Sequence, residues 1–363
     1  MQIGYLIKAI AFFWLIAKIL SYKTWVTERV YPVIPPLEIL KNIPDFLHYF
    51  LFVFSVLLLV ITLFFRRKQV LLIVLFLSEL LSCSLDTVRW QPWEYMYLCF
   101  LLIIIINDNR PKNILLLSHL FLVSIYFFSG LHKVGRDFLS EVWLNMVLVD
   151  FLGISMDVIL KYKLFFIGLI IPFVEIALAL LLLVPKLRKK VSYFLILMHL
   201  SILIFIGPFG LQYNTVIWPW NLAMICILLI VYAEPFEPAK TKMFTYHLYW
   251  LILWFVLPFF SLSGGWYQYL SFNLYSGKGD KMYICISGNP RELRPFLDAG
   301  THNICKTEYS VNLHNWALKE IKSVPVPEIE IYEKIAVYLK HKYSAGNLKI
   351  MLYNHRTQKR TEL

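Results

Sequence analysis

Charged side chains are scarce in this chain of 363 residues, of which only 16% are Asp, Glu, Lys or Arg. Hydrophobic residues make up 59% and aromatic residues 17%. A soluble globular domain carries about 25% charged residues and cannot bury this much apolar surface. The composition therefore predicts an integral membrane protein whose main partner is the lipid bilayer.

Acidic residues are outnumbered, and the net charge is +12. In a soluble protein such an excess would suggest nucleic-acid binding. In a membrane protein, basic cytoplasmic loops and anionic lipid headgroups account for it. We therefore expect no nucleic-acid partner.

Paired cysteines of the C-x-x-C type are absent, so the sequence predicts neither a metal site nor a dithiol redox centre. Cys83, Cys99 and Cys226 fall in apolar segments and are expected to be small core residues. Cys285 and Cys305 lie in a polar region and can form one disulfide if that region is exported, although spacing alone does not establish the pair.

Long apolar runs are the commonest feature of the chain. They cover residues 5–20, 47–65, 70–85, 94–107, 114–131, 163–184, 191–207, 216–233 and 245–262. The first lacks a basic leader and a small-residue cleavage site, which indicates a retained signal anchor. The runs at 70–85 and 94–107 are short for a hydrocarbon core of about 30 Å. The predicted fold is an all-α polytopic bundle of about eight to nine transmembrane helices at residues 1–262.

Residues 263–363 differ in composition, because charges, glycine and proline return there. Residues 272–287 alternate around a Gly-containing turn, which predicts two strands. Residues 328–343 have the apolar periodicity of a helix and follow the rigid V-P-V-P segment. This C-terminal region is expected to form a small extramembrane α+β domain.

Basic residues in the short loops set the predicted orientation. One side carries eleven of them and the other only Arg89. The eleven are Arg66, Arg67, Lys68, Arg110, Lys112, Lys186, Arg188, Lys189, Lys190, Lys240 and Lys242. Because cytoplasmic loops are enriched in Lys and Arg, the N-terminus is expected in the cytoplasm and the C-terminal tail outside.

Lys133 ends an apolar segment and shares a helix face with Tyr126 and His119, since the three are spaced seven residues apart. Two interpretations are nearly balanced. The lysine anchors the helix at the interface, or it is a partly desolvated amine whose neutral form serves as a base. The neighbouring His132 favours the second if it is ever protonated.

Glu175 and His199 lie near the middle of two consecutive apolar runs, about equally far from the basic loop at 185–190. Antiparallel helices would bring them to the same depth. A carboxylate in lipid costs about 3 kcal/mol even on mild scales, so it needs a partner or a cavity. The pair is expected either to hold the two helices together or to handle a proton in a pocket.

The loop before residue 94 adds Arg89, Trp90 and Trp93. Aromatic residues at this depth usually form an interfacial belt. The alternative is an aromatic floor for a flat ring ligand, with Arg89 beside it.

Several of these motifs together resemble a known family. The run Y-F-F-S-G-L-H-K-V-G-R-D-F at 126–138 is similar to the Y-F-x-A-G-x-K-K-x-D-x-D-W stretch of vitamin K-dependent gamma-carboxylases and of the related horizontally transferred transmembrane domain family. W-Q-P-W-E-Y-M-Y at 90–97 and a histidine followed by I-G-P-F at 206–209 resemble further motifs, in the same order. The resemblance covers about residues 86–233.

The resemblance implies roles for individual residues. Lys133 takes the position of the lysine regarded as the base that acts on reduced vitamin K, and His132 replaces the lysine before it. Glu175 and His199 match an acidic residue and a histidine of the family. Trp93 stands where the family has a histidine, and an indole cannot transfer a proton as imidazole does.

The resemblance therefore implies a bacterial-type inner-membrane protein with an outward pocket for a quinone-like, lipid-soluble ring. Lys133 would be the base, Glu175 and His199 would tune or relay protons, and Trp90 and Trp93 would stack on the ring beside Tyr126 and Arg89. A carboxylase would also need CO₂, O₂ and a quinol. The alternative is a non-enzymatic protein, either a small-solute transporter or a scaffold whose tail binds a protein partner. Transporters usually contain internal repeats, and the sequence has none.

Overall fold

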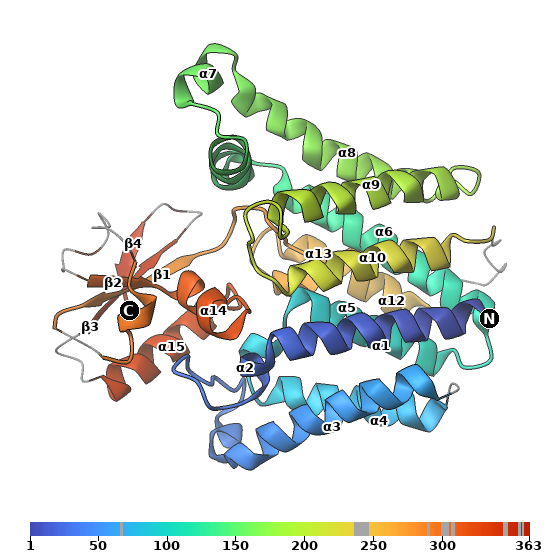
Figure 1. Cartoon of the computed structure of the whole chain (residues 1–363), viewed down its shortest axis with the longest axis horizontal. Coiled ribbons are helices and arrows are strands. Elements are labelled where there is room, and N and C mark those ends of the chain that lie inside the picture. The colour runs from blue at the N-terminus through green and yellow to red at the C-terminus, as the bar shows by residue number, and fades with distance from the viewer. Residues whose placement is uncertain are drawn as a thin grey trace. The chain divides into compact units, whose positions relative to one another are not determined.

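The computed structural model describes residues 1–65, 68–235, 247–288, 291–298, 305, 309–343, 348–354, 357 and 359–363. Four of the eleven basic residues that set the predicted orientation, Arg66, Arg67, Lys240 and Lys242, lie outside the described residues, as do the first two residues of the run 245–262. The described chain is mostly helical, with one small antiparallel sheet near its C-terminus (Figure 1).

Each of the nine apolar runs is helical over most of its described residues. The elements are α1 (Gln2–Leu20), α3 (Asp45–Phe64), α4 (Gln69–Ser84), α5 (Pro92–Ile106), α6 (Pro111–Lys133), η4 (Leu164–Leu169) continuing into α8 (Ile170–Leu181), α9 (Arg188–Ile206), α10 (Ile217–Val231), and the consecutive pieces α12 (Leu248–Leu251), η5 (Ile252–Val256) and α13 (Leu257–Phe260). Five helices of the described chain are long and apolar enough to cross a membrane: α1, α3, α6, η4 with α8, and α9. The others are shorter, with 10–17 residues.

Short elements occupy the connections. They are α2 (Tyr22–Trp25), η1 (Glu38–Asn42), η2 (Thr87–Arg89), η3 (Phe138–Phe151), α7 (Met156–Lys161), η6 (Tyr269–Ser271) and η7 (Arg294–Phe296). The longest of them, η3, is a π-helix, a form that is rare in proteins and often found at functional sites. The hydrogen bonding of a π-helix reaches back five residues, and the N–H of Leu152 accordingly donates to the carbonyl of Val147 at 3.0 Å.

The chain divides into two compact units. The first contains Met1–Ala17, Leu58–Phe76 and Pro92–Lys278, and the second contains Lys18–Leu57, Leu77–Gln91 and Gly279–Leu363. The predicted domain boundary at residue 262 stays a prediction. The sheet and the disulfide belong to the second unit, whereas the described residues of the motif-bearing run 111–233 belong to the first.

The helix α6 is the best-buried long helix of the first unit. Pro111 fits its first turn, where a missing backbone N–H costs nothing, and the ammonium group of Lys133 lies in its last turn, where a cation is favoured by the helix dipole. By contrast, α8 and α9 keep large apolar side chains on their outer surfaces. Such an arrangement is typical of a helix surrounded by lipid-facing helices.

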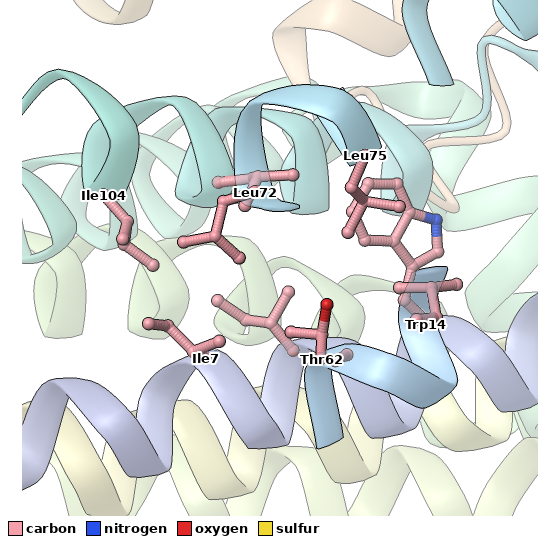
Figure 2. A pocket seen from close by; sticks show the side chains of 10 residues that line it. Ile7, Trp14, Thr62, Leu72, Leu75 and Ile104 are labelled. Atoms are coloured by element: carbon pink, nitrogen blue, oxygen red, sulfur yellow. The ribbon is translucent and has the colours of Figure 1, made fainter. Parts of the chain in front are cut away.

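The first unit is closely packed where α1, α3, α4 and α5 meet. The void at this place is only about 10 Å³ and is lined by apolar side chains, among them Ile7, Trp14, Leu72 and Ile104, together with Thr62 (Figure 2). A space of this size is at the lower limit for a single water molecule. It is a packing defect rather than a binding site.

The sheet of the second unit has the order β2-β1-β3-β4, with every neighbouring pair antiparallel. The strands are β1 (Lys281–Ile286), β2 (Tyr309–Asn312), β3 (Leu348–Tyr353) and β4 (Arg360–Glu362). Two helices accompany it: α14 (Leu313–Ile321), which packs on β1 and β2, and α15 (Ile329–Lys342). The predicted helix at 328–343 is thereby confirmed, as is a small α+β arrangement near the C-terminus.

The prediction of two strands within residues 272–287 is half wrong. The second strand is β1, but no strand forms before it. Phe272 and Tyr275 both have positive φ, at 53° and 48°, and Gly277 follows at 70°. Left-handed conformations break the extended backbone that a strand needs, and alternation of side chains does not reveal them.

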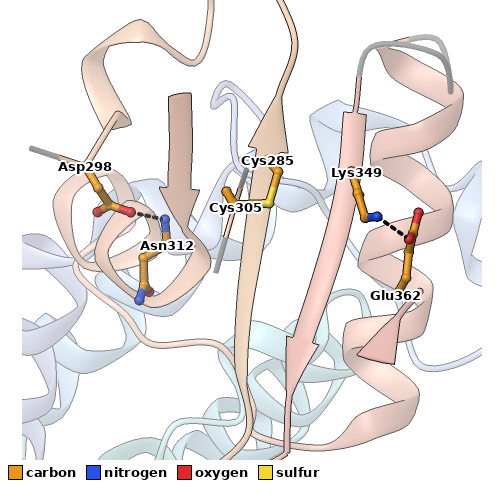
Figure 3. Close-up of a disulfide and its surroundings, with 6 residues drawn as sticks. All are labelled: Cys285, Asp298, Cys305, Asn312, Lys349 and Glu362. Atoms are coloured by element: carbon orange, nitrogen blue, oxygen red, sulfur yellow. Dashed lines mark hydrogen bonds and ion pairs between the residues drawn. A yellow bond between two sulfur atoms is a disulfide. The ribbon is translucent and has the colours of Figure 1, made fainter. Parts of the chain in front are cut away.

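Cys285 on β1 is joined to Cys305 by a disulfide, with the two Cα atoms 5.4 Å apart (Figure 3). The pair that spacing alone left open is therefore formed. Around it, Lys349 of β3 pairs with Glu362 of β4 at 2.7 Å, and Asp298 accepts a hydrogen bond from the backbone N–H of Asn312 at 2.8 Å.

We expect the double variant Cys285→Ala, Cys305→Ala to destabilise the second unit by about 3 kcal/mol, because a cross-link over 20 positions removes loop-closure entropy from the unfolded chain. The measurement is the urea concentration at which a protease begins to cut between residues 279 and 363 of the full chain in nanodiscs. A reductant should lower the wild-type midpoint to that of the variant. Equal midpoints for wild type and variant, with or without reductant, would contradict the expectation.

Candidate functional site

Three polar side chains of α6, spaced seven residues apart, each contact a polar side chain from another segment of the first unit. The contacts join His119 to Tyr232, Tyr126 to His199 and Lys133 to Glu175, at 2.9, 2.8 and 2.7 Å. The three polar side chains that the spacing placed on one helix face therefore form hydrogen bonds within the protein and do not face lipid.

Gly130 allows the third of these contacts to form. A Cβ atom at this position would lie 2.9 Å from Cγ1 of Ile176 and 3.0 Å from the carbonyl oxygen of Pro172, both on α8. Close backbone approach through a small residue is the usual way for membrane helices to pack tightly. Because α8 approaches α6 here, Glu175 comes within reach of Lys133 one turn further along.

Lys133 and Glu175 form an ion pair that is nearly closed off from the outside. The two side chains are 13% and 6% exposed. Lys133 Nζ donates to Glu175 Oε2 at 2.7 Å and to the hydroxyl of Ser129 at 2.6 Å. Within the described chain, the third N–H of Lys133 and the second carboxylate oxygen of Glu175 have no hydrogen-bond partner. One donor and one acceptor are thus left side by side.

His199 of α9 connects α6 to α10. Its Nε2 lies 2.8 Å from the hydroxyl of Tyr126, and its Nδ1 lies 2.7 Å from Oδ1 of Asn221. All three residues are buried. The chain of two hydrogen bonds crosses three helices and satisfies the polar atoms of an otherwise apolar interior.

The ion pair of Lys133 and Glu175 and the hydrogen-bond chain of Tyr126, His199 and Asn221 all line one cavity of about 190 Å³. Its remaining wall is almost entirely apolar. The lining side chains are Ile125, Tyr126, Ser129, Lys133, Phe138, Val142, Val147, Ile171, Glu175, Met198, His199, Ile202, Phe205, Ile206, Ile217, Trp220, Asn221, Met224, Leu274 and Tyr275. An apolar chamber with a few convergent polar groups is the usual form of a small-molecule site.

One wall of the cavity comes from η3 and from the segment after η6. Phe138 and Val142 of η3 pack with Tyr275. Gly277 fits against this wall only because it lacks a side chain, since a Cβ atom would lie 2.4 Å from the carbonyl oxygen of Asp137. Burial, with Tyr213 as a second cause, raises the pKa of Tyr275 well above its usual value, so its phenol stays protonated at neutral pH.

Four of the predicted site residues, Tyr126, Lys133, Glu175 and His199, therefore line the same cavity. The predicted direct contact between Glu175 and His199 is wrong. In the described chain Glu175 bonds to Lys133, and His199 bonds to Tyr126 and Asn221. Matching depth placed both side chains correctly along their helices but did not determine which neighbour each of them faces.

His132 does not line the cavity. The neighbouring positions 132 and 133 of a helix point about 100° apart, so the two side chains face different neighbours. Nε2 of His132 lies 3.1 Å from the hydroxyl of Ser261, which itself donates to the carbonyl of Pro258 at 2.7 Å. His132 therefore contacts the segment that follows α13 and not the cavity, and its assignment to the catalytic set stays a prediction.

Arg89, Trp90 and Trp93 are also absent from the cavity wall. Arg89 and Trp90 belong to the second unit, where Arg89 is fully buried. Trp93 is buried in the first unit and packs edge to face on Tyr97, with ring centroids 6.4 Å apart. Arg89 and Trp93 are therefore packed against protein, Trp90 is half-buried, and none of the three forms a floor for this cavity. Their assignment to ligand binding stays a prediction.

Sequence reasoning missed two residues of the site, Asn221 and Ser129. Asn221 ends the run W-P-W-N at 218–221, next to two tryptophans. A lone amide among apolar neighbours on a helix was the available signal, because a buried amide needs partners. Ser129 lies one helical turn before Lys133, a spacing that predicts a contact within the helix. Within the described chain, no three His, Cys, Asp or Glu side chains gather in a way that could hold a metal ion.

The chain matches no protein-family model, no curated protein and no solved structure. The geometry of the cavity and the resemblance of its motifs are the grounds for the function proposed below.

Proposed function

We propose that this chain is a multi-pass membrane protein with eight to nine spans whose cavity binds a lipid-soluble, quinone-like ring and exchanges a proton with it. The observation that carries the proposal is the unused donor on Lys133 beside the unused acceptor on Glu175, both at the wall of an apolar cavity. A ligand hydroxyl can occupy both positions at once, accepting from the ammonium and donating to the carboxylate.

The size of the cavity supports a ring ligand. An engineered apolar cavity of about 150 Å³ holds one benzene molecule. The space here is about 190 Å³, which admits the head group of a quinone but not a long chain. Ile171 lines the cavity and is also 39% exposed on the outer surface of α8. An apolar chain attached to the ring would leave past this side chain.

The Lys133 and Glu175 side chains supply the proton chemistry. In an apolar site a charged pair can become neutral when the proton moves from Lys133 Nζ to Glu175 Oε2 over their short hydrogen bond. Once Glu175 is protonated, the ligand hydroxyl turns to donate to the neutral amine, which accepts its proton and leaves a phenolate beside the new ammonium. The carboxylate partner makes this a two-residue base, which differs from the single desolvated lysine that was one of the two interpretations of the sequence.

The resemblance to vitamin K-dependent gamma-carboxylases supports a reduced quinone as the ligand. Trp93 stands at the position of the family's histidine and packs away from the cavity. We therefore propose ligand binding and proton exchange as the function, and not carboxylation of glutamate.

The proposal is tested by the binding of a radiolabelled 1,4-naphthoquinol to the full chain in nanodiscs. Ile202→Trp fills the cavity from α9, and we expect it to weaken binding at least tenfold because the ring and the indole compete for one space. The matched control is Ile204→Trp, two positions along the same helix, where the native side chain is 60% exposed. This control should bind like the wild type. Equal binding by the two variants, or no binding by the wild type, would refute the proposal. A scaffold or a small-solute transporter would then be the favoured function.

The proposed location is the inner membrane of a bacterial cell, with the N-terminus in the cytoplasm and residues 263–363 outside. The disulfide supports an extracytoplasmic tail, because structural disulfides persist in oxidising compartments. We expect a reporter that is active only in the periplasm to work when fused after Leu363. Activity of a cytoplasmic reporter at the same position, with none from the periplasmic one, would reverse the orientation.

A further inference from the structure

Asn221 occupies a position on α10 from which its amide faces both its own helix and His199. Its Nδ2 donates to the carbonyl of Ile217 at 2.8 Å, one turn earlier. Its Oδ1 lies 2.7 Å from Nδ1 of His199. The side chain is 5% exposed.

The partners determine which way the amide points. A backbone carbonyl only accepts hydrogen bonds, so the atom of Asn221 that faces Ile217 must be the nitrogen. The oxygen therefore faces His199. Because an amide oxygen is also an acceptor, the imidazole nitrogen opposite it must carry a hydrogen.

The hydrogen on Nδ1 of His199 determines the direction of the other hydrogen bond of this imidazole. In the neutral imidazole Nε2 is then an acceptor. The hydroxyl of Tyr126 lies 2.8 Å from it and must donate its only hydrogen there. The oxygen of Tyr126 keeps its lone pairs, and within the described chain it accepts no hydrogen bond.

We infer that Asn221 is a positioning residue that fixes the Nδ1–H tautomer of His199 and thereby makes Tyr126 a hydrogen-bond acceptor toward the cavity. The tautomer follows from the contacts of these three buried side chains alone. Its consequence rests on the proposed function: a ring ligand is selected for a hydroxyl group, which can donate to Tyr126, over a group that can only accept.

The tautomer is tested by ¹⁵N NMR of the full chain in nanodiscs with labelled histidine, in which protonated and unprotonated ring nitrogens have separate shifts. The His199 signals are assigned by their loss in His199→Gln. In the wild type we expect a protonated Nδ1 and an unprotonated Nε2. Asn221→Leu removes the acceptor and should allow Nε2–H to appear, whereas Asn221→Asp keeps an acceptor of the same size and should retain Nδ1–H.

Tyr126→Phe is the matched control, because it removes the other hydrogen bond of the same imidazole. If Asn221 sets the tautomer, this variant keeps Nδ1–H. A wild-type His199 protonated at Nε2 would overturn the inference. So would a tautomer that changes in Tyr126→Phe but not in Asn221→Leu.

The consequence for the ligand is measured separately. We expect Asn221→Leu to lower the affinity for 1,4-naphthoquinol by about 2- to 10-fold, the range of one net hydrogen bond. The affinity for its dimethyl ether should not fall, because an ether oxygen can accept from the Tyr126 hydroxyl once Nε2 of His199 carries the hydrogen. Equal losses for both compounds would overturn the selection. If the wild type binds neither compound, the proposed function fails, while the NMR result still decides the role of Asn221.

Discussion

Lys133→Arg abolishes proton exchange with the bound ring while leaving the helix bundle folded, if Lys133 is a base. An arginine can still pair with Glu175 and still places a cation at the end of α6. It cannot lose its proton at any pH that a protein tolerates, so the neutral form that the chemistry needs is missing. General acid and base catalysis is typically worth about 10²–10⁴ in rate. We therefore expect a loss of at least about 100-fold.

The measurement is quinol-dependent activity or genetic complementation by the variant, with binding of 1,4-naphthoquinol determined in parallel. Lys133→Ala should lose activity to the same degree and regain part of it with a small exogenous amine. Glu175→Gln should also be inactive, because an amide cannot take the proton from Lys133. Full activity in Lys133→Arg would return Lys133 to the role of an anchor that pairs with a buried carboxylate.

Arg89→Ala prevents stable folding of the second unit. The guanidinium of Arg89 is fully buried, and all five of its N–H groups have acceptors. These acceptors are the carbonyls of Thr24, Trp25 and Ser82, the hydroxyl of Ser82, and Nδ1 of His48, at 2.7–3.2 Å. The carbonyls of Thr24 and Ser82 keep a second donor, Arg29 and the N–H of Leu85. Removing the side chain costs about 1–3 kcal/mol for each buried acceptor left without a partner and opens a cavity besides, so we expect a loss above about 4 kcal/mol.

The charge of Arg89 is retained despite burial. Burial lowers its pKa to about 10, while the nearby Asp86 opposes this shift, so the guanidinium is protonated at neutral pH. Asp86 is itself paired with Arg29. The cluster therefore joins three segments of the second unit that lie far apart in sequence, at Thr24–Arg29, His48 and Ser82–Arg89.

The Arg89 prediction is measured as the yield of folded full-length protein and its resistance to protease in nanodiscs. Arg89→Lys keeps the charge but has three donors in place of five, and it should be intermediate. Lys41→Ala is the matched control, because Lys41 lies in the same unit with its side chain 56% exposed. A folded Arg89→Ala with wild-type resistance would show that the cluster contributes little, and a ligand role for Arg89 would then deserve a new test.

The helices were predictable from the sequence because apolar runs and local spacing determine them. The stripe of His119, Tyr126 and Lys133 needed only the seven-residue period. The partners of the stripe were not predictable, because they depend on which helix packs against which face. Gly130 lets α8 pack closely on α6, and this packing brings Glu175 into contact with Lys133. His199 contacts Tyr126 instead.

Loop residues were the least predictable part. Arg89 lies among aromatic residues in sequence, which favoured a ligand site, but its acceptors include carbonyls more than 60 positions earlier in the chain. Tyr275 reaches the cavity only because the backbone around it takes positive φ values where strands were expected. Neither feature follows from local spacing.

The most direct test of the central claim is a density map of the full chain in nanodiscs prepared with 1,4-naphthoquinol. We predict a flat ring in the cavity between α6, α8, α9 and α10, with one of its oxygen atoms within hydrogen-bond distance of Lys133 and Glu175. A cavity filled only by lipid chains, or a ring bound elsewhere while the cavity stays empty, would contradict the account.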